Sequence, residues 1–253
     1  MNKMDIKFKE LKEVNKKAII PFIAIGSKDL NETIEFVDII EQAGADMVNL
    51  GIPYSDPLAD GPIIEDAYND ALLSGIKVSD IIQCIGKITL NNNIPIIVTA
   101  YYNTIYCRRV KKFINELADM KVSGLIIPDI PMEERGELTE VCKERDISLI
   151  SIVTASSKER IKKITNGCDS FIYCLTGIKT NVKEYLQEVR ENSNLPICIA
   201  KDNYSLEYLK SIGEYYNGVI IGSDLVKIIN SKNDFSERKE EIIKLIKKAK
   251  ENI

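Results

Sequence analysis

Eight short runs of apolar residues, rich in isoleucine and valine, recur along the chain at residues 18–25, 46–50, 94–100, 124–128, 147–153, 170–175, 197–200 and 218–221. Apolar and polar residues do not alternate cleanly within these runs, as is typical of parallel strands that are covered on both faces. The segments between the runs instead repeat apolar residues at helical spacing, for example at Leu30, Ile34, Val37 and Ile40. The pattern therefore predicts parallel strands that alternate with amphipathic helices.

An eightfold alternation of strand and helix in 253 residues is typical of a (β/α)8 barrel, the α/β fold also called the TIM barrel. A doubly wound sheet normally has fewer strands. Two additions are expected: an opening helix near residues 6–14 that could plug the bottom of the barrel, and an extra pair of helical turns around 62–88. Residues 235–253 carry apolar positions at helical spacing among lysines and predict the last helix. We expect a single domain, residues 1–253, with an extra N-terminal helix.

Composition and charge narrow the classes of partner. The net charge is -4 and the lysines are spread along the chain, so the sequence predicts no basic stripe for nucleic acid or an anionic membrane. The first residues are charged and no run approaches about 18 apolar residues, so neither a secretion signal nor a membrane span is expected. The six cysteines show no CxxC spacing, which favours reduced packing thiols in a cytoplasmic protein. We expect a small-molecule substrate, no nucleic acid and no membrane.

The candidate chemistry lies where strands end, because barrel enzymes carry their catalytic groups on the loops that follow the strands. Asn49 stands near the end of the second run, and the proline-rich loop LGIPYSDPLADGP follows it at 50–62. Asp60 and Asp129 could do acid-base work at these strand ends, with Tyr173 as a proton donor. Asn49 could not, because an amide does not take up a proton near neutral pH.

Structural explanations of the same residues remain open. The acids of the loop suit turns, and Asp60-Gly61-Pro62 also suits the cap of a helix that begins at Pro62. Asp129 has prolines on both sides within two residues and could equally be structural. For Tyr101 and Tyr102, packing in the barrel with a satisfied hydroxyl is favoured over contact with a ligand.

Specific strings are spread over nearly the whole chain: Pro21-Phe22-Ile23, AGAD at 43–46, LGIPYSDPLADGP at 50–62, TAYYNTIY at 99–106, LIIPDIPMEE at 125–134, residues 156–161, FIY at 171–173 and GVIIGSDLVKII at 218–229. Together they resemble the tryptophan synthase α chain family, and the string at 50–62 is specific because few other barrels contain it. The resemblance implies retro-aldol cleavage of indole-3-glycerol phosphate to indole and glyceraldehyde 3-phosphate, with no cofactor and no metal. It also implies a pyridoxal-phosphate β-type subunit as a partner that consumes the indole.

The family's functional residues carry over only in part. By resemblance, Asp60 corresponds to the aspartate that contacts the indole nitrogen, and Tyr173 to the active-site tyrosine at the end of strand six. Asn49 falls where the family has its catalytic glutamate. Loss of a general base typically lowers a rate by about 10²–10⁴-fold, so the ancestral activity is expected to be weak or changed. Phe22, Tyr101 and Asp129 are further candidate substrate contacts at strand ends.

The phosphate site that the resemblance implies is altered as well. A glycine-serine pair that opens a helix after strand eight persists, where backbone N–H groups can face an anion. After strand seven, AKDN at 200–203 removes the family's two glycines and adds a lysine and an aspartate. After strand six, only the Gly-Ile pair at 177–178 matches the usual motif, and the loop is shorter than the family's lid. The candidate substrate contacts in this region are Gly177, Lys201, Asp202, Gly222 and Ser223.

Three hypotheses follow from these departures. The first is an α-chain-like lyase that acts on indole-3-glycerol phosphate or a related substrate with weakened or redirected chemistry. The second is a catalytically weak α-like subunit that binds and regulates a β-like partner through the loop 53–60 and residues 103–106. The third is an ordinary tryptophan synthase α chain that tolerates Asn49.

Overall fold

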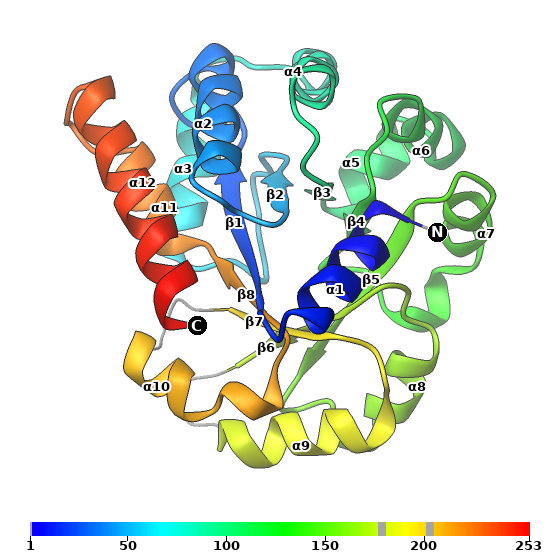
Figure 1. The fold of residues 1–253 in the computed structure, drawn as a ribbon. Helices are drawn as coiled ribbons and strands as arrows, with labels where there is room; N and C mark the ends of the chain where they lie inside the picture. The colour runs from blue at the N-terminus through cyan, green and yellow to red at the C-terminus, as the bar shows by residue number, and fades with distance from the viewer. Residues whose placement is uncertain (1, 177–180, 201–204) are drawn as a thin grey trace.

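Eight parallel strands close into a barrel in chain order, with β8 pairing back onto β1 (Figure 1). The computed structural model describes residues 2–176, 181–200 and 205–253. The strands are β1 (Ala18–Ala24), β2 (Val48–Gly51), β3 (Ile96–Thr99), β4 (Gly124–Ile126), β5 (Ser148–Thr154), β6 (Ile172–Leu175), β7 (Ile197–Ala200) and β8 (Gly218–Ile221). Each strand lies within or beside one of the eight apolar runs, so the predicted (β/α)8 barrel is confirmed.

Helices surround the barrel and carry their apolar stripes toward it. They are α1 (Lys3–Glu13), α2 (Leu30–Gln42), α3 (Pro62–Leu73), α4 (Val78–Asn91), α5 (Tyr102–Cys107), α6 (Val110–Asp119), α7 (Gly136–Glu144), α8 (Ile161–Asn166), α9 (Val182–Asn192), α10 (Leu206–Ser211), α11 (Ser223–Ile229) and α12 (Phe235–Asn252), with short 3-10 turns at Met132–Glu134, Lys158–Arg160 and Gly213–Tyr215. Residues 62–88, predicted as a pair of helical turns, form most of two full helices, α3 and α4. Within the described ranges, no helix is long and apolar enough to cross a bilayer.

The side chains of each strand divide between two apolar clusters. In β1, Ile20 and Phe22 belong to the cluster inside the barrel, whereas Ile19 and Ile23 belong to the cluster between the strands and the helices. Successive side chains of a strand point to opposite faces, and here both faces are buried. This explains why the strands read as continuous apolar runs rather than as alternating ones.

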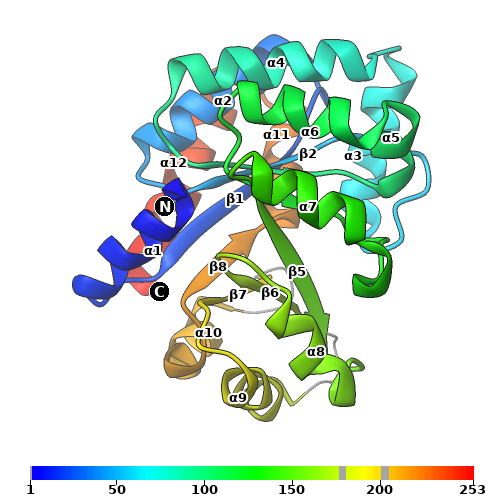
Figure 2. The ribbon, with the colours of Figure 1, turned by 90° about the vertical axis from the view of Figure 1, so that its right-hand side faces the viewer.

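The N-terminal helix closes one end of the barrel, as predicted for the opening helix. Met4 and Phe8 of α1 belong to the inner apolar cluster, and the Phe8 ring lies 5.5 Å from that of Phe171 between centroids. A Cβ atom at position 124 would lie 2.7 Å from the Met4 methyl carbon, so Gly124 leaves room for the Met4 side chain of α1 in its present position. The side view of Figure 2 shows α1 at the left-hand end of the barrel. Helix α1 does not cover the opposite end of the barrel, where the strands end and the candidate residues lie.

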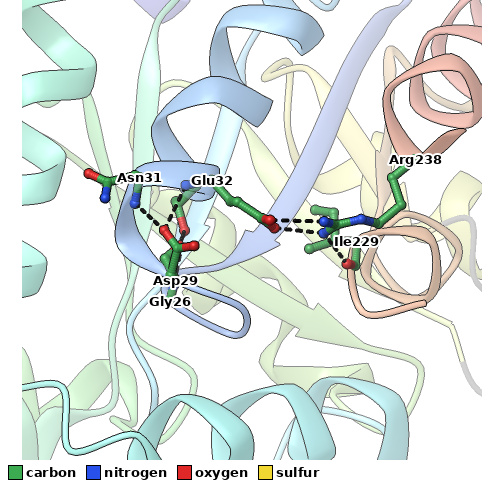
Figure 3. A network of polar contacts seen from close by, with 7 residues as sticks. Gly26, Asp29, Asn31, Glu32, Ile229 and Arg238 are labelled. Atoms are coloured by element: carbon green, nitrogen blue, oxygen red, sulfur yellow. Dashed lines mark hydrogen bonds and ion pairs between the residues drawn. The ribbon is translucent and has the colours of Figure 1, made fainter. Parts of the chain in front are cut away.

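The last helix is joined to the first helix of the barrel by a partly buried ion pair (Figure 3). The Arg238 guanidinium donates to both carboxylate oxygens of Glu32 at 2.6 and 2.9 Å, and to the Ile229 carbonyl at 2.9 Å. The Asp29 side chain caps α2 beside this pair by accepting the N–H groups of Asn31 and Glu32. Helices α2, α11 and α12 are therefore held together where the chain closes the ring.

Candidate functional site

Asn49 lies inside the barrel on β2, where it is 2% exposed. Its backbone is in register with Phe22 of β1 and Ile97 of β3. The Thr99 hydroxyl donates a hydrogen bond to the side-chain oxygen of Asn49 at 2.8 Å. The side-chain nitrogen of Asn49 donates to none of the residues that the structure describes. The end of β2 thus presents an oriented, neutral amide.

Asp60 is held in place by an aromatic pair. The Tyr101 hydroxyl donates to an Asp60 carboxylate oxygen at 2.7 Å and accepts the Ala59 N–H at 3.2 Å. The Tyr54 ring stacks on the Tyr101 ring with a centroid distance of 4.7 Å. Burial, and the nearby Asp60 carboxylate, raise the pKa of Tyr101 above its ordinary value, so its hydroxyl keeps the proton that it donates.

The cap predicted as an alternative role of Asp60 is not formed by its side chain. Gly61 is the N-cap of α3, with Pro62 at the first helical position and no side-chain hydrogen bond. Asp129 lies elsewhere: both of its carboxylate oxygens accept the Tyr102 N–H, at 2.8 and 3.1 Å. Asp129 therefore fixes the start of α5, in line with the structural alternative.

A small inner cavity of about 40 Å³ lies over the end of β2. Its polar groups come from Asn49, Asp60, Thr99 and Tyr173, and the rest of the wall is mainly apolar. A volume of this size holds a small polar group or a few water molecules but not an aromatic ring. The remaining lining residues are Phe22, Ala59, Ile64, Ile126, Pro128, Ile152, Leu175, Ile220 and Gly222.

A larger outer cavity of about 720 Å³ adjoins the inner one, since Asp60, Ile64 and Tyr173 line both. This volume is in the range of small-molecule sites. The described lining carries two acids, Asp60 and Asp224, and one base, Lys227.

The structure brings most of the predicted site residues together. Phe22, Asn49, Asp60, Tyr173 and Gly222 line the inner cavity, Ser223 lines the outer one, and Tyr101 supports Asp60. Asp129 is not among the described lining of either cavity. Gly177, Lys201 and Asp202 lie outside the described residues. Among the residues that are described, no group of three or more His, Cys, Asp or Glu side chains is placed to hold a metal ion.

Tyr68 supports the site, although no motif in the sequence points to it. It lies on α3, fully buried, and its hydroxyl has no hydrogen-bond partner within the described parts of the chain. A Cβ atom on Gly51 would lie 2.4 Å from the Tyr68 oxygen and 2.5 Å from the Phe22 ring, so only glycine fits there. Helical spacing is the feature of the sequence that could have indicated Tyr68, because Ile64 and Tyr68 are four residues apart on one face of α3.

A closed (β/α)8 barrel with its polar cavity at the carboxyl ends of the strands is the architecture of the TIM-barrel enzymes. Within that class the sequence identifies the family. The chain belongs to the tryptophan synthase α chain family, whose model matches residues 8–253.

Individual relatives agree with the family assignment. The tryptophan synthase α chain of Clostridium beijerinckii is 40% identical over 257 residues, covering 98% of this chain and 97% of the relative. The α chain of Legionella pneumophila has a solved structure with a TM-score of 0.90 and 25% identity, covering 100% of this chain and 98% of that one. A chain from the tryptophan synthase α2β2 complex of Pyrococcus furiosus has a TM-score of 0.84 and 28% identity, covering 92% and 98%.

Proposed function

We propose that the protein is a tryptophan synthase α-type subunit that binds indole-3-glycerol phosphate or a related indole substrate and cleaves its carbon–carbon bond slowly. The observation that carries this proposal is Asn49 on the floor of the inner cavity beside Asp60. The pocket keeps an acceptor for an indole N–H in Asp60, which Tyr101 orients. It has an amide where the family resemblance puts a catalytic carboxylate.

The chemistry of the cleavage explains why the amide matters. A retro-aldol reaction removes a proton from the substrate hydroxyl and delivers a proton to the leaving carbon, and both transfers are normally assisted by a positioned side chain. Asn49 can form hydrogen bonds but cannot carry a proton in either step. The site therefore orients its substrate better than it transfers protons.

The outer cavity contains charged groups that can face the headgroup of a substrate. Asp224 lies in the described lining near Ser223, the first residue of α11, and Lys227 lies one turn further along that helix. Lys227 therefore offers an ammonium group to an anionic headgroup within the described lining.

The lyase proposal is tested by indole release. The protein is incubated with indole-3-glycerol phosphate, and the released indole is separated from the charged substrate by extraction into an organic solvent and quantified. We expect slow release by the unaltered protein and an increase of about 10²-fold or more in Asn49→Glu, which supplies a general base. Asn49→Gln is the matched control, since it has the length of glutamate without the charge, and it should give no increase.

A contrary result would be rapid release by the unaltered protein that Asn49→Leu does not reduce. Residue 49 would then lie outside the proton path, and the chain would be an ordinary α chain that works through other groups.

A second candidate function is regulation of a β-type partner. Leu58, in the loop after β2, is 84% exposed, and Tyr106, on α5 after β3, is 66% exposed. A shallow cavity of about 530 Å³ beside Tyr106 includes the side chains of Asn103, Arg109 and Lys112 in its lining. Large exposed side chains that follow neighbouring strands at the same end of the barrel, next to basic groups, suit a partner surface with an acidic rim.

A further inference from the structure

The side-chain nitrogen of Asn49 is a buried donor without a partner in the described residues. Buried polar groups normally form hydrogen bonds, and leaving one unpaired is costly. Asn49 lines the inner cavity, and its nitrogen is not among the fully enclosed atoms that lack a partner. The cavity therefore gives access to this donor, and a bound group can complete it.

We propose that the inner cavity recognises the carbonyl oxygen of an indole whose side chain carries a C=O group, with Asn49 as the donor. The inference rests on the proposed function, because it takes the indole ring from there. It adds a substrate class: 3-acyl indoles bind in preference to the corresponding alcohols.

Thr99 fixes which end of the amide faces the cavity. Its hydroxyl is directed at the Asn49 oxygen at 2.8 Å, and Thr99 itself is 5% exposed. A hydroxyl that donates to the oxygen leaves the two N–H groups of the amide on the other side. Thr99 is in this sense a positioning residue, which acts on the ligand through Asn49.

The chemistry of the donor favours a carbonyl over a hydroxyl. The amide nitrogen offers two N–H donors and no acceptor, and a carbonyl oxygen has two lone pairs to receive them. An alcohol would bring its own proton to a position where residue 49 offers only donors. A carboxylate at this position would have the opposite preference, because it accepts from a hydroxyl and repels a carbonyl oxygen.

The sizes of the two cavities agree with a ligand whose carbonyl group lies in the inner cavity and whose ring lies in the outer one. The inner cavity, about 40 Å³, has room for an oxygen-bearing group but not for a ring. The outer cavity, about 720 Å³, has room for the ring. Asp60 lines both and can accept a donor on the ring while the carbonyl reaches inward to Asn49.

The test compares indole-3-carbaldehyde with indole-3-methanol, which share a skeleton and differ in C=O against CH₂–OH. Binding of each to the full chain is measured by isothermal titration calorimetry. We expect the aldehyde to bind about tenfold more tightly to the unaltered protein, the value of one good hydrogen bond. Asn49→Leu should remove the preference, and Asn49→Asp should reverse it.

Thr99→Val tests the positioning role. It keeps the shape of the side chain and removes the hydroxyl, so the amide is free to turn and the ratio of the two affinities should fall toward one. Circular dichroism and the melting temperature of each variant show whether it is folded. A merely structural role of Thr99 would lower the melting temperature and leave the ratio unchanged.

The outcomes separate this inference from the function on which it rests. Equal affinities for the two compounds in the unaltered protein, or a preference that survives in Asn49→Leu, would overturn the inference and leave an indole site in place. If the folded protein binds neither compound, nor indole itself, the proposed indole site fails and the inference fails with it.

Discussion

At the scale of single residues, the cavity divides its hydrogen bonding between one donor and one acceptor. Asn49 faces the cavity with N–H groups, because Thr99 occupies its oxygen. Asp60 contributes carboxylate oxygens, one of which receives the Tyr101 hydroxyl. A site of this kind can orient a ligand at two points. It lacks, at position 49, a group that can move a proton.

The cysteines lead to a prediction about thiol reactivity. Cys107 is exposed, whereas the other five cysteines are buried. Burial raises the pKa of Cys84 and Cys142 to about 12 and that of Cys168 to about 11, so these thiols stay protonated at pH 8, and the thiolate is the reactive form. Native protein should therefore react with Ellman's reagent in a fast phase of one thiol.

Cys107→Ser is the matched variant for that measurement. It should abolish the fast phase while the reagent still titrates the remaining thiols in denaturant. A second fast thiol in the native variant would show that one of the buried cysteines is accessible.

Two of the site residues could be predicted from the sequence because their signals are local. Asn49 stands near the end of an apolar run, and Asp60 stands in a proline-rich loop directly after it. The contacts of these residues could not be predicted. The Asn49–Thr99 bond depends on the register of β2 against β3, in which Gly51 pairs with Thr99. An alternation of apolar and polar residues normally specifies register, but these strands are apolar on both faces, so their sequence does not specify it.

At the scale of elements, the Glu32–Arg238 pair is expected to be a main contributor to closure of the helical ring. The Arg238 side chain is 7% exposed and that of Glu32 is 25% exposed. Arg238 also lies over the rings of Phe36 and Phe235. Removing one member of a buried pair leaves an uncompensated charge and typically costs about 3–5 kcal/mol. We expect Glu32→Ala to lower the free energy of unfolding by about 3 kcal/mol in urea denaturation. This value is at the lower end of the range because Glu32 is partly exposed.

Two variants control this prediction. Glu35→Ala lies on the same helix with its side chain exposed, and it should change the free energy of unfolding by less than about 0.5 kcal/mol. The double variant Glu32→Ala/Arg238→Met removes both charges, so its loss should be smaller than the sum of the single losses. Strict additivity would mean that the two side chains do not interact in solution.

The extent of the two helices between β2 and β3 could not be predicted from the hydrophobic pattern. The sequence predicted only helical turns around 62–88, whereas the chain forms α3 and α4 there. Gly75 has a positive φ of 79° and divides the two helices, and such a left-handed residue suits glycine. That Tyr68 of α3 reaches the end of β2 is a tertiary contact, which helical period does not reveal.

At the scale of the whole molecule, the fold was predictable because its signal repeats eight times. An error in one strand boundary does not alter the number of strands. Eight parallel strands that are joined by helices can adopt few arrangements other than a closed barrel. β1, β7 and β8 lie where the apolar runs predicted, and β2 and β3 are shorter than their runs. Each of the two cavities, by contrast, depends on side-chain volumes from five or more elements at once, which no local pattern contains.

The exposed side chains at the open end of the barrel lead to a prediction about partnership. We expect the protein to change the rate at which a tryptophan synthase β subunit, such as that of the Pyrococcus furiosus α2β2 complex, consumes indole. Leu58 is 84% exposed, and burying such a side chain at an interface contributes about 2 kcal/mol. Leu58→Asp should therefore weaken binding by tenfold or more, as measured by the concentration of α-type subunit that gives half the rate change.

Leu90→Asp is the matched control for this experiment. Leu90 is 86% exposed but lies near the end of α4, just before β3 begins, and so at the opposite end of the barrel from the loops. It should leave the half-maximal concentration unchanged. Equal weakening by both substitutions would indicate a general loss of solubility or fold rather than a docking surface. No rate change at any concentration of the unaltered protein would remove the regulatory proposal, and the rate of indole release would then decide between the slow lyase and an ordinary α chain.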